Sequence, residues 1–236
     1  MNPAPAALSV VLPAYNEEAL LDGCVRALHG ALATLKVTAE IIIVNDGSRD
    51  GTAGIADRLA GELPGVIALH QANQGIGGAF RTGVQRATGD YLILWPADMP
   101  AEPADLAPYT ARFGHADVIV GVRQQRLGYN PLMRFNAWLY PKLVATLFGL
   151  RLRDVNWIHA YRRDKFTRIV LTQRGIPMLV EALVRLRDLG ATFVEVDVRM
   201  KLRLGGVASA ARGKVMWRTL TGLFSFWNLW RKERRA

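Results

Sequence analysis

The residue of this sequence most suited to chemistry is Asp98, an isolated acid that follows an apolar segment. The segment at 91–95 (YLILW) has the length and the aromatic and β-branched content of a buried strand. Ligands of open α/β sheets bind beyond the carboxyl ends of the strands, so Asp98 is a candidate contact to a substrate or a metal ion. The alternative is that Asp98 begins a helix, because residues 99–102 supply the proline and acid that suit a first turn.

Short polar side chains follow the other predicted strands in the same way. Loops at 13–18, 45–50, 73–78 and 96–102 should meet at one edge of a sheet. Acceptor groups at such an edge suit the hydroxyls of a ribose and the edge of a base, and a tyrosine can cover a ring face, so we expect a nucleotide to bind there. Each residue taken alone is also what a turn or a helix cap uses. The loops supply Tyr15, Glu17, Asn45, Asp46 and Asp98.

The elements that position these loops alternate along the chain. Strands are predicted at 8–12, 40–44, 66–70, 91–95, 117–122 and 192–200, helices at 19–35, 52–63, 75–87, 104–113, 132–148 and 177–189, and irregular structure at 153–163. This alternation is typical of a single α/β domain with a mostly parallel central sheet and helices on both of its faces. We place this domain at 1–212, and a basic, aromatic, amphipathic helix at 213–236.

Composition limits the partners. The 236 residues carry a net charge of +10, which predicts attraction to nucleic acid, to an anionic membrane surface or to a phosphorylated substrate. Nucleic acid ranks last, because no nucleic-acid-binding motif is present. Cys24 is the only cysteine, which excludes an intrachain disulfide and fits a reducing compartment. We expect neither a signal peptide nor a membrane-spanning helix, since the N-terminus lacks a basic region and no run of about 18 apolar residues occurs.

Spacing excludes three common classes of site. The glycine-rich run at 73–83 has Phe80 where a dinucleotide fingerprint needs its last glycine, which argues against an NAD enzyme. No Gly-Lys-Ser or Gly-Lys-Thr follows four spacer residues, so a P-loop is not supported. The histidines do not fall at metal-ligand spacing. They are His29, His70, His115 and His159.

Several motifs occur in a fixed order: LPAYNEE at 12–18, VNDGSRDGT at 44–52, NQGIGGAFRTG at 73–83 and ATGDYLILWPADM at 87–99. In order and spacing they resemble the family 2 glycosyltransferases of GT-A fold. The second half resembles the dolichol-phosphate mannose synthase branch through VGVR ending at Arg123, Arg134 in LMRFN, Asp154 ahead of AYRR, Glu181, and the run at 195–209. The likeness covers roughly residues 8–209.

The resemblance implies an inverting transfer of a sugar, mannose or glucose, from a nucleotide-diphosphate sugar to a polyprenyl phosphate. It assigns the nucleotide to Pro13, Tyr15, Glu17, Asn45, Asp46 and Asp98, catalysis to Asp98, Arg123 and Arg203, and the acceptor phosphate to Arg123, Arg134 and Arg203. The alternatives are a soluble sugar or glycan as acceptor, or a catalytically weak protein that binds nucleotide sugars.

The metal motif departs from the family. The resemblance implies a Mg²⁺ or Mn²⁺ ion at Asp98, but Pro96 and Pro100 stand where further ligands are usual. Asn45 and Ile158 also replace the more common Asp and Gly. We therefore expect a metal that is weakly bound or dispensable, with arginines such as Arg162 and Arg203 carrying part of its electrostatic load.

The end of the chain combines aromatic and basic residues. An aromatic helix that ends in RKERRA suits a membrane surface, and it equally suits packing on the domain or on a partner subunit. We expect a cytoplasmic protein that is peripheral on the membrane, with a small membrane subunit or a second copy of the chain as further candidate partners. The aromatic residues are Trp217, Phe224, Phe226, Trp227 and Trp230.

Overall fold

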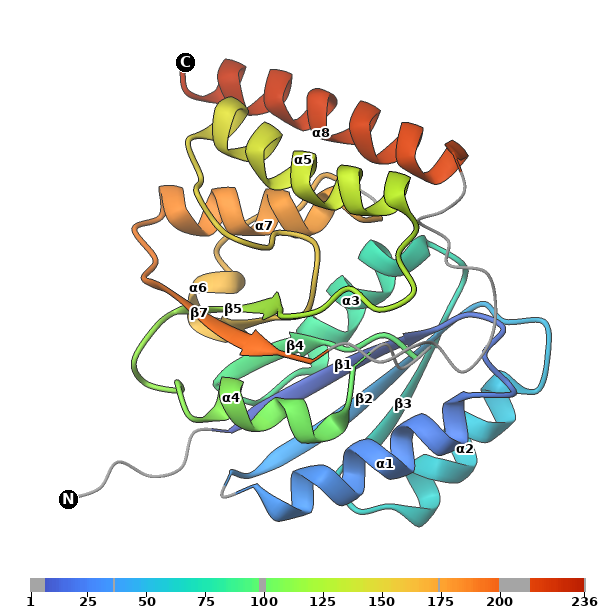
Figure 1. Ribbon diagram of the computed structural model, residues 1–236. Helices are drawn as coiled ribbons and strands as arrows, with labels where there is room; N and C mark the ends of the chain where they lie inside the picture. Colours follow the sequence, from blue (N-terminus) through green and yellow to red (C-terminus); the bar gives the residue numbers. More distant parts are fainter. Residues whose placement is uncertain (1–6, 36, 98–100, 174, 200–212, 236) are drawn as a thin grey trace.

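The computed structural model describes residues 7–35, 37–97, 101–173, 175–199 and 213–235, and its centre is a seven-stranded sheet (Figure 1). The strand order is β3-β2-β1-β4-β6-β5-β7, and every strand except β6 runs in the same direction. The carboxyl ends of six strands therefore lie at one edge. The strands are β1 (Leu8–Ala14), β2 (Ala39–Asp46), β3 (Val66–Gln71), β4 (Tyr91–Leu94), β5 (Val118–Arg123), β6 (His159–Arg162) and β7 (Phe193–Val198).

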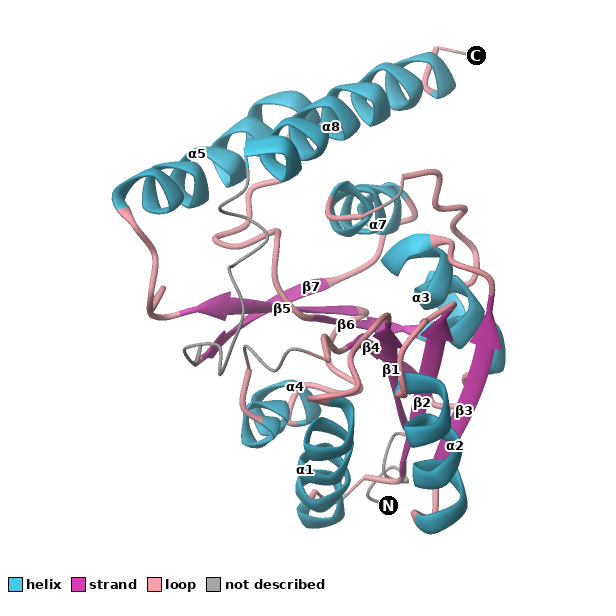
Figure 2. Ribbon diagram, turned by 90° about the vertical axis from the view of Figure 1, so that its right-hand side faces the viewer, coloured by secondary structure: helices cyan, strands magenta, loops and turns pink. Residues whose placement is uncertain are grey.

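Helices cover both faces of the sheet, as the sequence predicts. Figure 2 shows α1, α2 and α4 on one side and α3, α5, α7 and α8 on the other. Each face has its own buried cluster of apolar side chains. The helices are α1 (Leu21–Thr34), α2 (Thr52–Glu62), α3 (Gly75–Arg86), α4 (Ala107–Thr110), α5 (Pro131–Phe148), α6 (Arg163–Phe166), α7 (Pro177–Asp188) and α8 (Gly213–Glu233), and a 3₁₀ turn, η1, spans Pro103–Leu106.

Burial on both faces explains why the central strands β1 and β2 are mostly apolar. In β1, Leu8, Val10 and Leu12 join the cluster beneath α1 and α2, whereas Val11 joins the opposite cluster. Both faces of a strand buried in this way must be apolar, which produces a continuous run instead of an alternating one. Cys24, on α1, is fully buried in the first of these clusters.

A glycine sets how closely α3 approaches the sheet. A Cβ atom on Gly83 would lie 2.3 Å from Cγ1 of Val11, in the centre of β1. Only a residue without a side chain allows this contact. Gly83 therefore fixes the distance between β1 and the helix that follows β3.

One strand was missed by the sequence analysis. The segment 153–163, predicted to be irregular, contains β6, which lies antiparallel between β4 and β5. Its four residues, HAYR, are too few for a periodic pattern, although the first three are buried. The predicted helix at 104–113 is also shorter than expected and is divided into η1 and α4.

The C-terminal helix packs on the domain. Both views place α8 beside α5 (Figures 1 and 2), and Leu223 and Phe226 of α8 are fully buried in the cluster that lies on this face of the sheet. Trp227 Nε1 donates a hydrogen bond to the carbonyl oxygen of Leu147, at 3.0 Å. No helix in the described part of the chain is long and apolar enough to span a membrane.

Candidate active site

The loop after β1 is held by the start of α2. The amide of Glu17 donates to Thr52 Oγ1 at 2.8 Å, and Asn16 takes a φ of 55°, which side-chain-bearing residues rarely adopt. Pro13 lies within β1, paired with β2. Tyr15, just beyond the strand, is 44% exposed, so its ring is accessible at the carboxyl edge of the sheet.

Asn45 and Asp46 end β2 and are both buried. Asn45 Oδ1 accepts a hydrogen bond from the amide of Ser48, at 3.1 Å, which is turn chemistry. Asp46 Oδ1 accepts from Gln71 Nε2 at 2.6 Å and from the amide of Gln74 at 2.8 Å. Asp46 therefore ties the end of β2 to β3 and to the glycine-rich start of α3, and its role toward a nucleotide stays a prediction.

The predicted metal site follows β4. Trp95 is fully buried and its amide donates to the carbonyl oxygen of Val11 at 2.9 Å. Asp98 and Pro100 lie outside the described residues, as does Arg203, so their predicted roles stay predictions. Among the residues that are described, no group of three or more His, Cys, Asp or Glu could hold a metal ion. These residues alone do not fit a metal site made of protein side chains.

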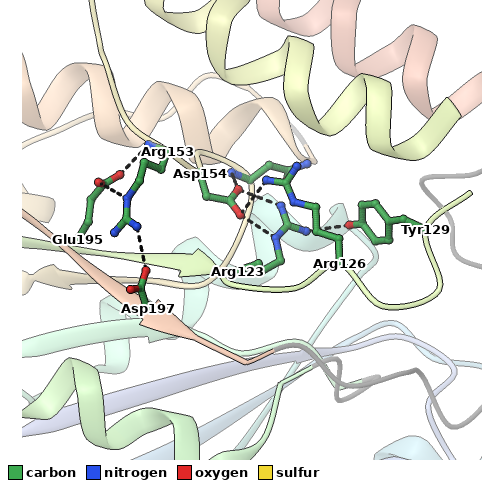
Figure 3. A network of polar contacts seen from close by, with 8 residues as sticks. Arg123, Arg126, Tyr129, Arg153, Asp154, Glu195 and Asp197 are labelled. Carbon is green, nitrogen blue, oxygen red and sulfur yellow. Dashed lines mark hydrogen bonds and ion pairs between the residues drawn. The ribbon is translucent and has the colours of Figure 1, made fainter. Parts of the chain in front are cut away.

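At the end of β5, Arg123 forms a buried, two-point ion pair with Asp154 (Figure 3). The Nε–Oδ2 and Nη2–Oδ1 distances are 2.7 and 2.9 Å, and the side chains are 7% and 2% exposed. Arg123 Nη1 donates to the hydroxyl of Tyr129 at 2.8 Å, and the guanidinium carbon lies 4.7 Å from the Trp157 ring centroid. Burial alone would raise the pKa of Asp154, but the hydrogen bonds and charge of Arg123 outweigh it and lower the pKa. The pair is therefore charged at neutral pH.

A second arginine shares the same carboxylate. Arg126 Nη2 lies 3.5 Å from Asp154 Oδ2. Two positive charges and one negative charge leave this cluster of Arg123, Arg126 and Asp154 with one uncompensated positive charge. Arg134, exposed on the first turn of α5, donates from Nε to the carbonyl oxygen of Tyr129, at 3.2 Å. The structure thus brings the predicted Arg123 and Arg134 to the two ends of one loop, with Arg126 between them.

The chain segment that carries Asp154 is anchored on β7. Glu195 accepts hydrogen bonds from the amide and from Nε of Arg153, at 2.6 and 2.8 Å, and Asp197 accepts from Arg153 Nη1 at 3.0 Å (Figure 3). Arg153 is thus held by the edge strand while its neighbour Asp154 turns inward to Arg123. This arrangement positions the buried carboxylate.

A cavity of about 140 Å³ lies beside the arginine cluster, between α5 and α8. Arg123, Tyr129, Asp154 and Asn156 form its polar end. Its other walls are mostly apolar side chains of the two helices and of the segment before α7, including Met133, Ala137, Tyr140, Leu143, Ile176, Met216 and Leu220.

β6 has two consequences for the site. His159 is buried close to this cluster; desolvation lowers its pKa to about 4, so it is neutral at pH 7 and adds no charge. Arg162, expected to share the electrostatic load of the metal, is wrongly placed for that role. It pairs with Tyr91 at the amino end of β4, because β6 runs against its neighbours.

Arg126 and Tyr129 were not predicted from the sequence, and Asp154 was predicted only as part of a motif. Arg123 and Arg126 stand three residues apart in a polar stretch after a strand, and this spacing was an available signal. The partner carboxylate lies 31 residues further along the chain, where no local pattern connects it to either arginine.

Comparison with known proteins agrees with this architecture. The family model described as Glycosyl transferase family 2 matches residues 9–173. The undecaprenyl-phosphate mannosyltransferase of Micrococcus luteus is 29% identical over 221 residues, which cover 87% of this chain and 88% of that protein. An undecaprenyl-phosphate 4-deoxy-4-formamido-L-arabinose transferase of Pseudomonas fluorescens is 28% identical over 78% of this chain, which spans only about half (56%) of that relative's length.

Solved structures share the fold. Glucosyl-3-phosphoglycerate synthase of Mycobacterium tuberculosis, in complex with Mn²⁺, UDP and glucosyl-3-phosphoglycerate, superposes with a TM-score of 0.73 at 19% identity, covering 94% of this chain and 80% of that one. Mannosyl-3-phosphoglycerate synthase of Rubrobacter xylanophilus has a TM-score of 0.70 at 17% identity, covering 98% and 76%. The predicted GT-A architecture is confirmed. With its motifs, its sheet and a family model that matches most of its length, the chain belongs to glycosyl transferase family 2.

Proposed function

We propose that this chain transfers a sugar, mannose or glucose, from a nucleotide-diphosphate sugar to a polyprenyl phosphate, with inversion at the anomeric carbon. The observation that carries the proposal is the arginine cluster at the end of β5, which has one uncompensated positive charge and borders an apolar cavity. An acceptor with an anionic phosphate and an apolar chain matches both features. Relatives named for transfer to undecaprenyl phosphate support the same acceptor class.

The chemistry needs little proton transfer. A phosphate monoester has a second pKa near 6, so its oxygen is already largely anionic at pH 7. This oxygen would attack the anomeric carbon as the bond to the nucleotide diphosphate breaks, and one displacement inverts the carbon. Arg123, Arg126 and Arg134 would hold the acceptor phosphate in line. The neutral, buried His159 is then not required as a base.

The donor would bind at the carboxyl ends of β1 and β2. We assign the accessible ring of Tyr15 to the base and the loop carboxylates to the ribose, and the five residues of this site are Pro13, Tyr15, Glu17, Asn45 and Asp46. A Mg²⁺ or Mn²⁺ ion would rest mainly on Asp98 and on the donor's own diphosphate, and would be weakly bound. The prolines at 96 and 100, which stand where further ligands are usual in the family, support a weak site.

We also place the protein on the cytoplasmic face of a membrane. Four large apolar residues of α5 are 41–58% exposed, although the opposite face of the same helix packs on the domain. A helix that is apolar on both faces suits a bilayer surface or a partner. Trp217 and Phe224 of α8 are exposed as well, whereas its buried Leu223 and Phe226 belong to the core. The exposed residues of α5 are Leu132, Phe135, Trp138 and Leu139.

A transfer assay tests the enzymatic proposal. The purified chain is mixed with vesicles that contain undecaprenyl phosphate and with GDP- and UDP-sugars, with Mn²⁺ or with EDTA. We expect a lipid-linked sugar from one donor, and a loss of about 10- to 100-fold in kcat/KM for Arg126→Ala, because a charge-assisted phosphate contact is worth about 1.5–3 kcal/mol. Transfer to a soluble sugar instead would establish the alternative acceptor class. Donor binding without any transfer would indicate a nucleotide-sugar-binding protein.

Vesicle flotation tests the membrane face separately. The double variant Phe135→Asp/Trp138→Asp should no longer float with anionic vesicles, since it places two charges in the apolar face of α5. Val170→Asp, which changes an exposed apolar residue outside α5 and α8, should float like the wild type. Equal flotation of all three proteins would refute the assignment of this face to the membrane, and a partner subunit or a second copy of the chain would become the better candidate for it.

A further inference from the structure

The cavity between α5 and α8 joins a charged end to apolar walls. Arg123 and Asp154 close one end, and the opposite walls come from residues that recur at helical spacing along α5, at 133, 137 and 140. Further along the same face of α5, Val144 and Phe148 are fully covered by the core. At these two positions the second half of the helix is packed on the core, whereas its first half borders the cavity beside the arginine cluster.

The cavity suits a small, branched apolar group. Its volume of about 140 Å³ is close to that of an engineered protein cavity, about 150 Å³, that binds benzene. A five-carbon isoprene unit is of this size. Met133 of α5 and Met216 of α8 both line the cavity. Unbranched methionine side chains adapt to the shape of a bound group.

A buried hydroxyl without a hydrogen-bond partner also favours an isoprenoid phosphate in this cavity. The hydroxyl oxygen of Tyr140, a residue of the cavity wall, is buried and has no hydrogen-bond partner among the described residues. Desolvation raises its pKa, so the hydroxyl stays a neutral donor. A buried donor without an acceptor destabilises a protein, and an ester or phosphate oxygen at the head of an isoprenoid chain would remove that cost.

We propose that this cavity binds the first isoprene unit of the polyprenyl phosphate acceptor. The inference rests on the proposed function and adds to it the site at which the lipid chain leaves the phosphate. The phosphate lies at Arg123 and Arg126, and the isoprene unit lies between α5 and α8. Leu139 lines the cavity and is also 41% exposed on the outer face of α5, so the rest of the chain can continue from the cavity toward the membrane face.

Titration calorimetry with two soluble probes tests this site. Farnesyl phosphate carries isoprene units, whereas methyl phosphate carries only the charged head. We expect the wild type to bind farnesyl phosphate at least about 30-fold more tightly. Each buried methylene contributes a factor of about four, so full burial of only two or three of the five carbons already gives about 16- to 64-fold. Ala137→Phe fills the cavity from α5 and should weaken farnesyl phosphate at least tenfold, with methyl phosphate within twofold of the wild type.

Two further variants control this result. Leu220→Phe fills the cavity from α8 and should repeat the effect, so a folding defect in one variant does not decide the outcome. Ala145→Phe makes the same substitution on α5 outside the cavity and should change neither affinity. Thermal melts report whether each variant is folded.

The inference is overturned if the cavity-filling variants keep the wild-type ratio of the two affinities, or if Ala145→Phe lowers that ratio as much as they do. The transfer assay separates this outcome from a failure of the proposed function. Transfer to polyprenyl phosphate with an unchanged affinity ratio refutes the cavity site alone. The expected affinity pattern without transfer from any nucleotide sugar refutes the proposed function and leaves the lipid site standing.

Discussion

Removing the carboxylate of Asp154 should destabilise the protein more than any other single loss of charge in the described part of the chain. Asp154→Ala leaves Arg123 buried without its counter-ion and next to Arg126. Breaking a buried pair in this way costs about 3–5 kcal/mol, a large part of the roughly 5–15 kcal/mol by which domains are stable. For a chain of this size, each kcal/mol lowers Tm by about 2–4 °C, so we expect a fall of about 6–20 °C.

Urea unfolding followed by circular dichroism measures this loss, and the chain offers a matched control. Asp197→Ala removes an acid from the exposed pair with Arg153, where both side chains are about half exposed, and should cost about 0–1 kcal/mol. The double variant Arg123→Met/Asp154→Leu should regain most of the loss, because an apolar pair needs no compensation for buried charge. A loss below about 1 kcal/mol for Asp154→Ala would show that water reaches Arg123, and would refute the argument from burial.

The stability that Asp154→Ala loses should depend on pH in one direction only. The pKa of Asp154 is lower in the folded chain than its ordinary value of 3.8. Its stabilising contribution is therefore complete above pH 3.8 and disappears as the pH falls through the folded-state pKa. The difference in unfolding free energy between the wild type and Asp154→Ala should be constant near neutral pH and should shrink only below pH 3.8. A difference that shrinks already at neutral pH would mean that the carboxyl is not held in its charged form by Arg123.

Three further predictions test other parts of the structure. His159 has a pKa of about 4 in the folded chain and 6.5 ordinarily, so below pH 6.5 the unfolded chain binds a proton that the folded chain does not, and the free energy of unfolding should fall by about 3 kcal/mol from pH 6.5 to 4. His159→Leu should remove this pH dependence in urea unfolding experiments. An equal pH dependence in the variant would contradict the lowered pKa of His159. Gly83→Ala should lower the free energy of unfolding by about 1–3 kcal/mol, because the added Cβ would overlap Val11. Gly54→Ala in α2 adds a Cβ that contacts no other residue and should raise the free energy of unfolding by up to about 1 kcal/mol. The Tm values of the two variants should therefore shift in opposite directions. Phe226→Ala should cost about 3–5 kcal/mol and Phe224→Ala less than about 0.5 kcal/mol, since only the first is buried, and equal costs would mean that α8 does not pack as described.

The edge of the sheet that carries the polar loops was predictable, because the strands and turns in the first half of the chain have clear local sequence patterns. Each strand of the first parallel units is a short apolar run that ends in polar turn residues, as at Asn45 and Asp46. The carboxyl ends of parallel strands meet at one edge whatever the remaining sequence does. The placement of Tyr15 and Asp46 at the ends of neighbouring strands therefore follows from the order of the elements.

The function class was also accessible from the sequence, through motifs in a fixed order. The chemical environment of each motif residue was not. Arg123 was predicted as a ligand of the acceptor phosphate, but the sequence did not show that its side chain is only 7% exposed and bound to Asp154. The net charge available to an acceptor depends on Arg126 as well, and a count of arginines does not show which of them is neutralised.

The sequence by itself determined the alternating strands and helices, the edge that carries the polar loops, and the family. The tertiary structure alone decided the rest, because it depends on contacts between residues far apart in the chain. β6 is too short to show a period, and its reversed direction moves Arg162 away from the site. The basic tail forms α8, whose Leu223 and Phe226 are buried in the core of the domain. The sequence shows that this helix has an apolar face but does not show which surface covers it. The pairing of Arg123 with Asp154, and the cavity that opens beside it, exist only once β5, α5 and α8 have been brought together.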